Sequence, residues 1–242
     1  MKNKKIITII GARPQFIKAA PLSALLRKNF EEIIIHTGQH YDQNMSDIFF
    51  KELQIPTPDY NLNIGSSSHA KQTGEMLIAI EDILEKEKPD AVIVFGDTNS
   101  TMAGAISAAK LNIPVIHIEA GLRSFDNRMP EEINRIVTDK ISSILFAPTK
   151  TAVKNLKNEG ITDNVYLVGD IMYDSILKYI KIAESNSNIL KALNINPKEY
   201  LFLTLHRASL TDNADFLKNL IKIIGSCKNN WIFPIHPRTK KY

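Results

Sequence analysis

The sequence predicts an α/β fold in which helices cover both faces of a parallel β-sheet. Short apolar runs rich in Ile and Val alternate with longer segments of helical periodicity, which is the pattern of βαβ units. The short runs are almost continuously apolar, as expected for strands that are buried on both faces. Hydrophobic residues make up 44% and charged residues 23% of the 242, so a sizeable core can form.

The expected elements of the first domain follow one another along residues 1–170. The strands are short and mostly β-branched: Ile6–Ile10, Ile33–Ile35, Ala91–Phe95, Val115–Ile118, Ile144–Ala147 and Val165–Val168. The helices between them place apolar residues three or four positions apart: Pro14–Lys28, Asn44–Leu53, Ala70–Lys88, Ser100–Lys110, Glu131–Ile144 and Thr149–Glu159. Pro14 suits the first turn of its helix, and the small residues of Ser100–Lys110 suit close packing on a sheet.

The chain is expected to hold one domain and the beginning of another. Residues 1–170 form the N-terminal domain, and residues 171–198 form a connecting helix and a linker rich in Ser and Asn. Residues 199–242 then restart the pattern with a strand, a helix and a strand: Tyr200–Leu205, Asp212–Lys228 and Trp231–Ile235. These three elements cannot bury both faces of a sheet, so the second α/β domain is expected to be incomplete.

Composition argues against several classes of partner and location. The net charge is +4, but the Lys and Arg residues are scattered and form no basic stripe with interleaved aromatics, so nucleic acid is not expected. No stretch approaches the roughly 20 apolar residues of a membrane span, and the apolar run near the N-terminus is too short for a signal peptide. The single cysteine, Cys227, allows no disulfide within the chain, which favours the reducing cytoplasm.

Polar residues follow nearly every expected strand, at the place where open parallel sheets bind their ligands. In chain order these residues are Arg13, His36, Asp97, Glu119, Asp170, His206, Arg207 and His236. Each has a simple alternative: Asp97 could cap the helix that follows it, and Glu119 could pair with Arg123. Their convergence at one sheet edge, facing the edge of a second sheet, nevertheless predicts a ligand site.

The residue types at this edge favour proton transfer beside a phosphorylated ligand. Arg13 lies next to an expected helix N-terminus, where its charge and the free N–H groups favour a diphosphate, although no Walker or G-x-G-x-x-G loop is present. No Cys/His cluster has metal-ligand spacing, no second carboxylate pairs with Asp97, and no G-x-S-x-G occurs. Carboxylates with at least one His, and no metal or cofactor, remain as the acid and base groups.

Two adjacent carboxylates, Glu131 and Glu132, open the helix that begins at Pro130. Their negative charges complement the positive end of the helix dipole, which explains both without any catalytic role. The preceding loop, residues 121–128, lies within reach of the same sheet edge, so a role in the site stays open.

Several strings in the chain resemble a known family. The strings are Gly11–Gln15, Gly96–Thr98, His117–Arg123 (His-Ile-Glu-Ala-Gly-Leu-Arg), Pro130–Arg135 (Pro-Glu-Glu-Ile-Asn-Arg) and His206-Arg207. In order and spacing they are similar to the non-hydrolysing UDP-N-acetylglucosamine 2-epimerases, over nearly the whole chain. The two longest strings are very specific. The hydrolysing relatives tend to have Arg-Ala-Asp where this chain has Arg13-Pro14-Gln15.

The resemblance implies a GT-B-like architecture of two Rossmann-like domains with the active site between them. It implies inversion at C2 of the sugar, through elimination of UDP to a 2-acetamidoglucal and re-addition of UDP, without metal or cofactor. The residues that it implies are Asp97, Glu119, Glu131 and His206 as catalytic groups, and Arg13, Lys18, Arg135, Arg207 and His236 as substrate-binding groups. It also implies that residues 199–242 begin a UDP-binding domain and that the protein is a homodimer.

Other readings stay open beside UDP-N-acetylglucosamine (UDP-GlcNAc). Residues 11–16, 44–47 and 123–125 look close to a subgroup that acts on UDP-2,3-diacetamido-2,3-dideoxy-glucuronate. A GT-B glycosyltransferase would share the architecture but need only one base, and a nucleotide-sugar binder would need none. Residues 37–45 are longer than the matching stretch of members regulated by a second UDP-GlcNAc, which puts transfer of that regulatory site in doubt.

The 242-residue polypeptide itself is expected to have negligible activity. The family continues beyond the position of Tyr242, and its later part carries a Gly-rich Ser/Glu motif that binds UDP. Turnover of UDP-GlcNAc by the purified 242-residue polypeptide would contradict this expectation.

Overall fold

The computed structural model describes residues 4–39, 50–205, 208–211 and 213–235. Contacts divide the chain into two compact units, Met1–Lys181 and Ile182–Tyr242. The boundary falls inside helix α7 (Ile171–Asn186), within the segment expected to connect the domains. Among the described residues, no helix is both long enough and apolar enough to cross a membrane.

The first unit is built on a seven-stranded parallel sheet with the order β3-β2-β1-β4-β5-β6-β7. Its strands are β1 (Lys5–Ile10), β2 (Glu31–His36), β3 (Tyr60–Asn61), β4 (Ala91–Phe95), β5 (Val115–Ile118), β6 (Ile144–Ala147) and β7 (Val165–Leu167). The predicted α/β fold with a parallel sheet is confirmed. The strand order reverses between β1 and β4, and in such sheets the crevice at this switch point is where ligands bind.

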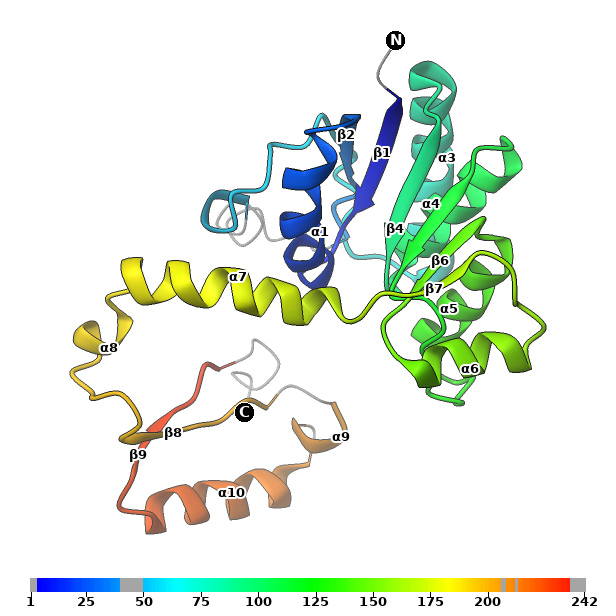
Figure 1. Cartoon of the computed structure of the whole chain (residues 1–242). Coiled ribbons are helices and arrows are strands. Elements are labelled where there is room, and N and C mark those ends of the chain that lie inside the picture. The colour runs from blue at the N-terminus through cyan, green and yellow to red at the C-terminus, as the bar shows by residue number, and fades with distance from the viewer. Residues whose placement is uncertain (1–3, 40–49, 206–207, 212, 236–242) are drawn as a thin grey trace. The chain divides into compact units, whose positions relative to one another are not determined.

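Helices cover both faces of this sheet (Figure 1). One face packs against α3 (His69–Glu87), α4 (Asn99–Lys110) and α5 (Pro130–Ile141), and the other against α1 (Arg13–Leu26) and α7. Alternate side chains of β1 serve the two faces: Ile7 and Ile9 point to α3 and α4, while Ile6 and Ile10 join Phe16 of α1. Helix α6 (Lys150–Asn158) packs separately against β6 and β7.

The small residues of α4 allow the close packing that the sequence predicts. A Cβ atom added to Gly104 would lie 2.6 Å from Cδ1 of Ile9, so α4 approaches β1 more closely than a larger residue would permit. This contact places the N-terminus of α4, and the turn that precedes it, directly over the switch point of the sheet.

The structure differs from the predicted elements in places, for local reasons. Helix α5 ends at Ile141 rather than Ile144, because Ser142 is extended and β6 begins at Ile144. Strand β3 was not predicted, since two residues carry no periodicity of their own. Of the helix expected at Asn44–Leu53, residues 44–49 lie outside the described residues, and residues 50–52 are helical.

The second unit contains a small parallel pair of strands, β8 (Tyr200–Phe202) and β9 (Asn230–Ile232). Its helices are α8 (Ile189–Ala192), α9 (Ala208–Thr211) and α10 (Ala214–Ser226), of which α8 lies inside the predicted linker. Asn213 caps α10 by accepting a hydrogen bond from the amide of Phe216 at 3.0 Å. Phe202 and Ile221 are 62% and 67% exposed, as expected for a strand–helix–strand unit that cannot cover both faces.

Candidate functional site

Two carboxylates occupy the turns that follow β4 and β5, neighbouring strands of the sheet. Asp97 follows Gly96, whose φ of +63° makes the sharp turn out of β4. The N-cap of α4 is Thr98, whose hydroxyl accepts a hydrogen bond from the amide of Thr101 at 3.3 Å. Asp97 is therefore not the capping residue of this helix, and its carboxylate is available for other partners.

Asp97 pairs with Arg135 of α5. The guanidinium of Arg135 contacts the Asp97 carboxylate through Nη2 and donates from Nη1 to Oε2 of Glu132 at 2.7 Å. Burial alone would lower the pKa of Arg135, but the hydrogen bond to Glu132 and the charge of Asp97 outweigh burial and raise it. Asp97 keeps 31% of its side chain exposed, so the paired carboxylate can still meet a ligand.

Glu119 adopts a backbone conformation that is unusual for any residue other than glycine. Its φ is +75°, and its amide and that of Ala120 both donate to the carbonyl oxygen of Phe146, at 3.1 and 3.0 Å. A non-glycine residue in the left-handed region is disfavoured and persists only where its surroundings enforce it, which is frequent at functional sites. The loop after β5 is thus held in a strained turn that presents the Glu119 side chain.

Lys18 of α1 forms an ion pair with Glu119, and both side chains are mostly buried. Gly96 lies directly beneath this pair: a Cβ atom at residue 96 would lie 3.0 Å from Glu119 Oε2 and 3.2 Å from Lys18 Nζ. The loops after β4 and β5 therefore touch, and they bring Asp97 and Glu119 to one edge of the sheet. The alternative pairing of Glu119 with Arg123 does not occur.

A pocket of about 220 Å³ opens beside Glu119. Its walls are mainly apolar and come from α1, β5, β6 and the start of α7: Leu22, Ile118, Phe146, Pro148, Val168 and Ile171. Two exposed carboxylates, Asp170 and Asp174, also line it. Glu119 thus faces a hollow with apolar walls and an acidic rim, and none of the described residues that line it is Lys or Arg.

The two adjacent carboxylates of α5 have different surroundings. Glu132 is buried and accepts hydrogen bonds from the amides of Ser124 and Phe125, both at 2.9 Å, and from Arg135. Burial alone would raise the pKa of Glu132, but these hydrogen bonds prevail and lower it. Glu131 is exposed, and no contact among the described residues joins it to Asp97 or Glu119.

Helix α5 buries its polar face and exposes part of its apolar face, contrary to what its apolar spacing predicts. Ile133 and Ile136 are 49% and 37% exposed, whereas the buried residues are the polar ones: Glu132, Asn134, Thr138 and Asp139. Asn134 donates to the carbonyl oxygen of Asp97 at 2.8 Å, which ties α5 to the Asp97 turn. The inward face of α5 is therefore a polar support for the site.

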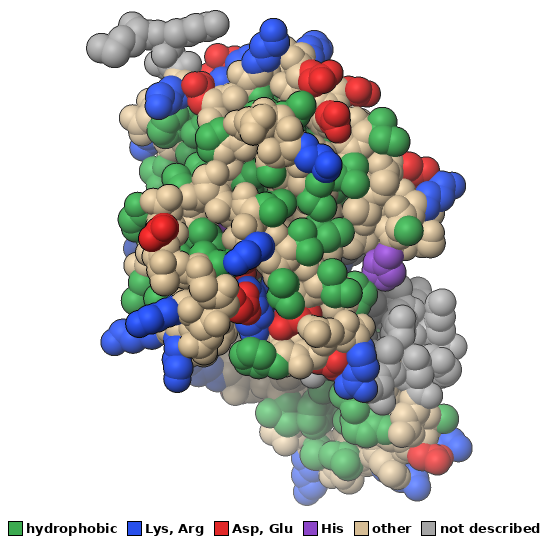
Figure 2. Space-filling view, turned by 90° about the vertical axis from the view of Figure 1, so that its right-hand side faces the viewer, with side chains coloured by type: hydrophobic (Ala, Val, Ile, Leu, Met, Phe, Trp, Pro, Cys, Tyr) green, Lys and Arg blue, Asp and Glu red, His purple; other side chains and the backbone are tan. Residues whose placement is uncertain are grey.

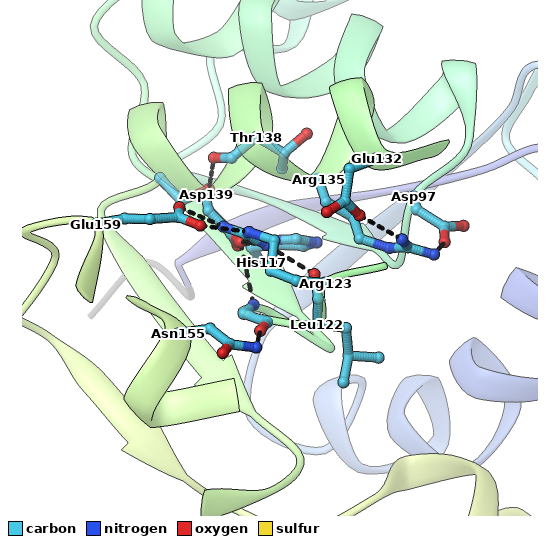
Figure 3. Close-up of polar contacts among 12 residues, drawn as sticks. Asp97, His117, Leu122, Arg123, Glu132, Arg135, Thr138, Asp139, Asn155 and Glu159 are labelled. Atoms are coloured by element: carbon cyan, nitrogen blue, oxygen red, sulfur yellow. Dashed lines mark hydrogen bonds and ion pairs between the residues drawn. The ribbon is translucent and has the colours of Figure 1, made fainter. Parts of the chain in front are cut away.

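A buried polar network lies behind the loops that follow β4 and β5 (Figure 3). His117 of β5 contacts Asp139 through Nδ1 at 2.7 Å and the carbonyl oxygen of Gly96 through Nε2 at 2.8 Å. Arg123 bridges Asp139 at 2.7 Å and Glu159 at 2.6 Å. Burial alone would raise the pKa of Asp139, but hydrogen bonds from His117 and Arg123 and their charges lower it.

The amides at the start of α1 are already occupied. Gln15 accepts hydrogen bonds through Oε1 from the amides of Gly11 and Ala12, at 2.8 and 3.0 Å. Its Nε2 donates to the carbonyl oxygen of Phe95 and to the hydroxyl of Thr101. Gln15 therefore clips the loop after β1 to the end of β4, and a diphosphate at this point would depend mainly on exposed Arg13.

The remaining predicted residues belong to the second unit. His206, Arg207 and His236 lie outside the described residues. Within the part of the chain that the structure describes, no group of three or more His, Cys, Asp or Glu side chains could hold a metal ion.

Comparison with known proteins identifies the family of the chain. The family model described as UDP-N-acetylglucosamine 2-epimerase matches residues 24–242. The chain is 62% identical, over 98% of its length, to a "UDP-N-acetylglucosamine 2-epimerase homolog" of Methanococcus maripaludis, and it covers 67% of that relative. It is 50% identical to the UDP-2,3-diacetamido-2,3-dideoxy-D-glucuronate 2-epimerase of Pseudomonas aeruginosa, of which it covers 68%.

A solved structure extends the agreement to three dimensions. The crystal structure of Methanocaldococcus jannaschii UDP-GlcNAc 2-epimerase in complex with UDP-GlcNAc and UDP matches with a TM-score of 0.88 and 53% identity. The match covers 98% of this chain and 67% of that one, so the chain spans about two thirds of the length of these relatives. The matched structures are GT-B-like epimerases, which confirms the predicted fold class. The chain belongs to the UDP-N-acetylglucosamine 2-epimerase family.

Proposed function

We propose that the protein is a non-hydrolysing UDP-GlcNAc 2-epimerase that interconverts UDP-GlcNAc and UDP-ManNAc. The observation that carries the proposal is the meeting of Asp97 and Glu119 on adjacent loops at one sheet edge, each paired with a cation. Inversion at C2 needs one group to remove a proton and another to return one on the opposite face. Two carboxylates from different loops can approach a sugar ring from different directions.

The proposed reaction balances without an external reagent. One carboxylate takes the proton from C2, the C1–O bond breaks, and UDP leaves with the bonding electrons as a C1=C2 double bond forms. The second group then returns a proton to the other face of C2, and a UDP oxygen attacks C1 to restore the bond. Glu131 and His206 are proposed as further catalytic groups, with His206 near the diphosphate.

Substrate binding is proposed to combine the two domains. Arg13, Lys18 and Arg135 of the N-terminal domain would contact the sugar or the diphosphate, although Lys18 and Arg135 also hold Glu119 and Asp97 in place. Arg207 and His236 of the second domain would bind UDP. The charges of the three arginines favour a diphosphate over a neutral ligand.

The second candidate substrate is UDP-2,3-diacetamido-2,3-dideoxy-glucuronate, which the 50% identical Pseudomonas aeruginosa relative supports. That sugar carries a carboxylate of its own. Among the described residues that line the pocket beside Glu119, Asp170 and Asp174 carry negative charges that would repel such a group. This repulsion favours UDP-GlcNAc as the substrate.

Deuterium entry at C2 tests the proposed reaction. The protein, expressed from its complete reading frame, is incubated with UDP-GlcNAc in heavy water, and the recovered sugars are analysed by NMR. We expect deuterium at C2 of both epimers, because the second proton comes from a group that exchanges with solvent. A glycosyltransferase would leave C2 untouched, and a parallel incubation with the diacetamido-uronate compares the two substrates. Absence of deuterium with either sugar would refute the epimerase proposal.

We also propose that the protein is a homodimer that uses the face formed by α3, α4 and α5. Figure 2 shows hydrophobic side chains gathered over the middle of one side of the molecule. Ile78 of α3 is 68% exposed, and Ile133 of α5 is 49% exposed and lines a hollow together with Leu77 of α3 and Met102 of α4. An exposed apolar surface of this kind is typical of a protein interface.

Light scattering of the protein at micromolar concentration should therefore give twice the chain mass. The double replacement Ile133→Asp with Ile136→Asp is expected to give a monomer, whereas Leu25→Asp, at a more exposed residue of α1, should leave the dimer intact. A monomeric parent protein would contradict the proposal.

A cytoplasmic location is proposed on the single cysteine alone.

A further inference from the structure

The buried pair His117–Asp139 contacts both loops that carry the proposed catalytic carboxylates. The carbonyl oxygen of Gly96, which accepts from His117, belongs to the residue just before Asp97. The amide of Gly121, which donates to Asp139 Oδ2 at 3.1 Å, lies two residues after Glu119. Both side chains of the pair are fully buried. The pair therefore holds the main chain at Gly96, next to Asp97, and at Gly121, close to Glu119.

The partner of His117 Nε2 fixes the direction of one of its two hydrogen bonds. A carbonyl oxygen can only accept, so Nε2 donates to Gly96. Asp139 accepts from the Gly121 amide and from Arg123 through Oδ2, and its Oδ1 lies 2.7 Å from His117 Nδ1. The imidazole ring therefore connects Asp139 of α5 to the turn after β4.

These loops need such support because their backbones are not regular. Gly96, Glu119 and Gly121 all have positive φ, at +63°, +75° and +80°. Backbone hydrogen bonds hold the amides of Gly96 and Glu119 to the carbonyl oxygens of Ile118 and Phe146, but they do not fix the turns that follow. A change of one dihedral angle there would move the adjacent carboxylate. Asn155 of α6 donates to the carbonyl oxygen of Gly121 at 3.0 Å. The loop that carries Glu119 is therefore held at Gly121 by both Asp139 and Asn155.

We propose that His117 and Asp139 are positioning residues of the epimerisation. They fix the Gly96 carbonyl and the Gly121 amide, and through them the directions from which Asp97 and Glu119 approach the sugar. This inference rests on the proposed function. Neither residue touches substrate. Loss of the pair moves the two carboxylates relative to each other, which disturbs the partition of the intermediate between the two faces of C2.

Variants of the protein expressed from its complete reading frame test this role. His117→Leu removes the grip on Gly96, and Asp139→Ala removes the acceptor for the Gly121 amide. In each we expect kcat per folded molecule to fall at least tenfold while KM for UDP-GlcNAc changes less than threefold. In heavy water, the ratio of deuterated returned substrate to deuterated epimer should also change. Asp139→Asn keeps an acceptor for Gly121 and can donate to a neutral His117, so it should restore most of kcat.

A buried carboxylate at the opposite end of the sheet supplies a matched control. Glu32 of β2 accepts from Thr8, Ser23 and Arg27, as Asp139 accepts from a side chain, an amide and an arginine. Glu32→Ala should lower the melting temperature by an amount similar to Asp139→Ala but leave kcat per folded molecule and the deuterium ratio unchanged. An equal effect of both replacements on the ratio would show that the network serves stability alone.

Nuclear magnetic resonance of the His117 ring gives a readout that does not depend on turnover or on the alanine variant folding. The Nε2–H proton of His117, which donates to the Gly96 carbonyl, is expected as a slowly exchanging signal in the parent protein and in Asp139→Asn. Absence of a slowly exchanging ring N–H signal in the parent would overturn the inference. Unchanged turnover in His117→Leu and Asp139→Ala would also overturn the inference. Absence of C2 exchange in the parent would instead refute the proposed function.

Discussion

Replacing Glu119 with Gln is expected to lower kcat by about 10²- to 10⁴-fold, the range that a positioned acid or base contributes. The amide oxygen of the replacement can still accept from Lys18, so the ion pair becomes a hydrogen bond and the loop after β5 should keep its fold. The KM for UDP-GlcNAc should change little, because the lost group acts on the proton at C2 rather than on the diphosphate. Steady-state kinetics and a thermal melt separate the two effects.

The companion replacement Asp97→Asn shows which carboxylate acts on which face. Deuterium entry is followed from UDP-GlcNAc and from UDP-ManNAc in each variant. A variant that has lost the base for one epimer should fail to exchange that epimer's C2 proton while it loses less exchange from the other. Glu85→Gln, at an exposed residue of α3, is the matched carboxylate control and should retain full activity. Activity within threefold of the parent in both Glu119→Gln and Asp97→Asn would remove them as acid and base.

The ends of the strands were the most predictable part of this site. Asp97 and Glu119 directly follow strands whose apolar runs are unambiguous, and parallel strands must bring such residues to one edge. Their partners were less accessible to sequence reasoning. Lys18 lies on α1, far from Glu119 along the chain, and only the packing of α1 over β1, β2 and β4 brings the pair together. Gln15 likewise satisfies amides that appeared free for a ligand.

Helix α5 shows why residue spacing alone did not assign the buried face. Ile133 and Ile136 repeat at helical spacing, yet Glu132 and Asp139 are the buried residues. An apolar stripe predicts burial against something, and it does not distinguish the core of its own chain from another surface. The orientation of α5 also separates its two adjacent carboxylates. Glu132 is buried and contacts Arg135, while Glu131 is exposed. Helix-dipole arguments treat both carboxylates alike, so they could not separate them.

Gly121→Ala should be the most damaging single methyl addition near the site. The φ of Gly121 is +80°, which costs an alanine about 1–2 kcal/mol. A Cβ atom there would lie 2.5 Å from the carbonyl oxygen of Ala152 and 2.9 Å from its carbonyl carbon. Both atoms belong to the backbone of α6, which cannot rotate away as a side chain can. Overpacking of this kind adds about 1–3 kcal/mol or more, so we expect a loss of about 2–5 kcal/mol in the free energy of unfolding.

Gly160→Ala separates the strain from the clash. Gly160 follows α6 with a φ of +75°, nearly that of Gly121, but nothing lies within 4 Å of its missing Cβ atom. Its replacement should therefore cost only the backbone strain, and the difference between the two variants in chemical denaturation measures the contact with Ala152. Equal losses would mean that α6 yields without cost. If α6 does move in Gly121→Ala, Asn155 and the Gly121 amide move with it, so kcat of the folded fraction should fall in that variant and not in Gly160→Ala. The close packing of Gly121 against α6 would then be what keeps the Glu119 turn in its strained conformation.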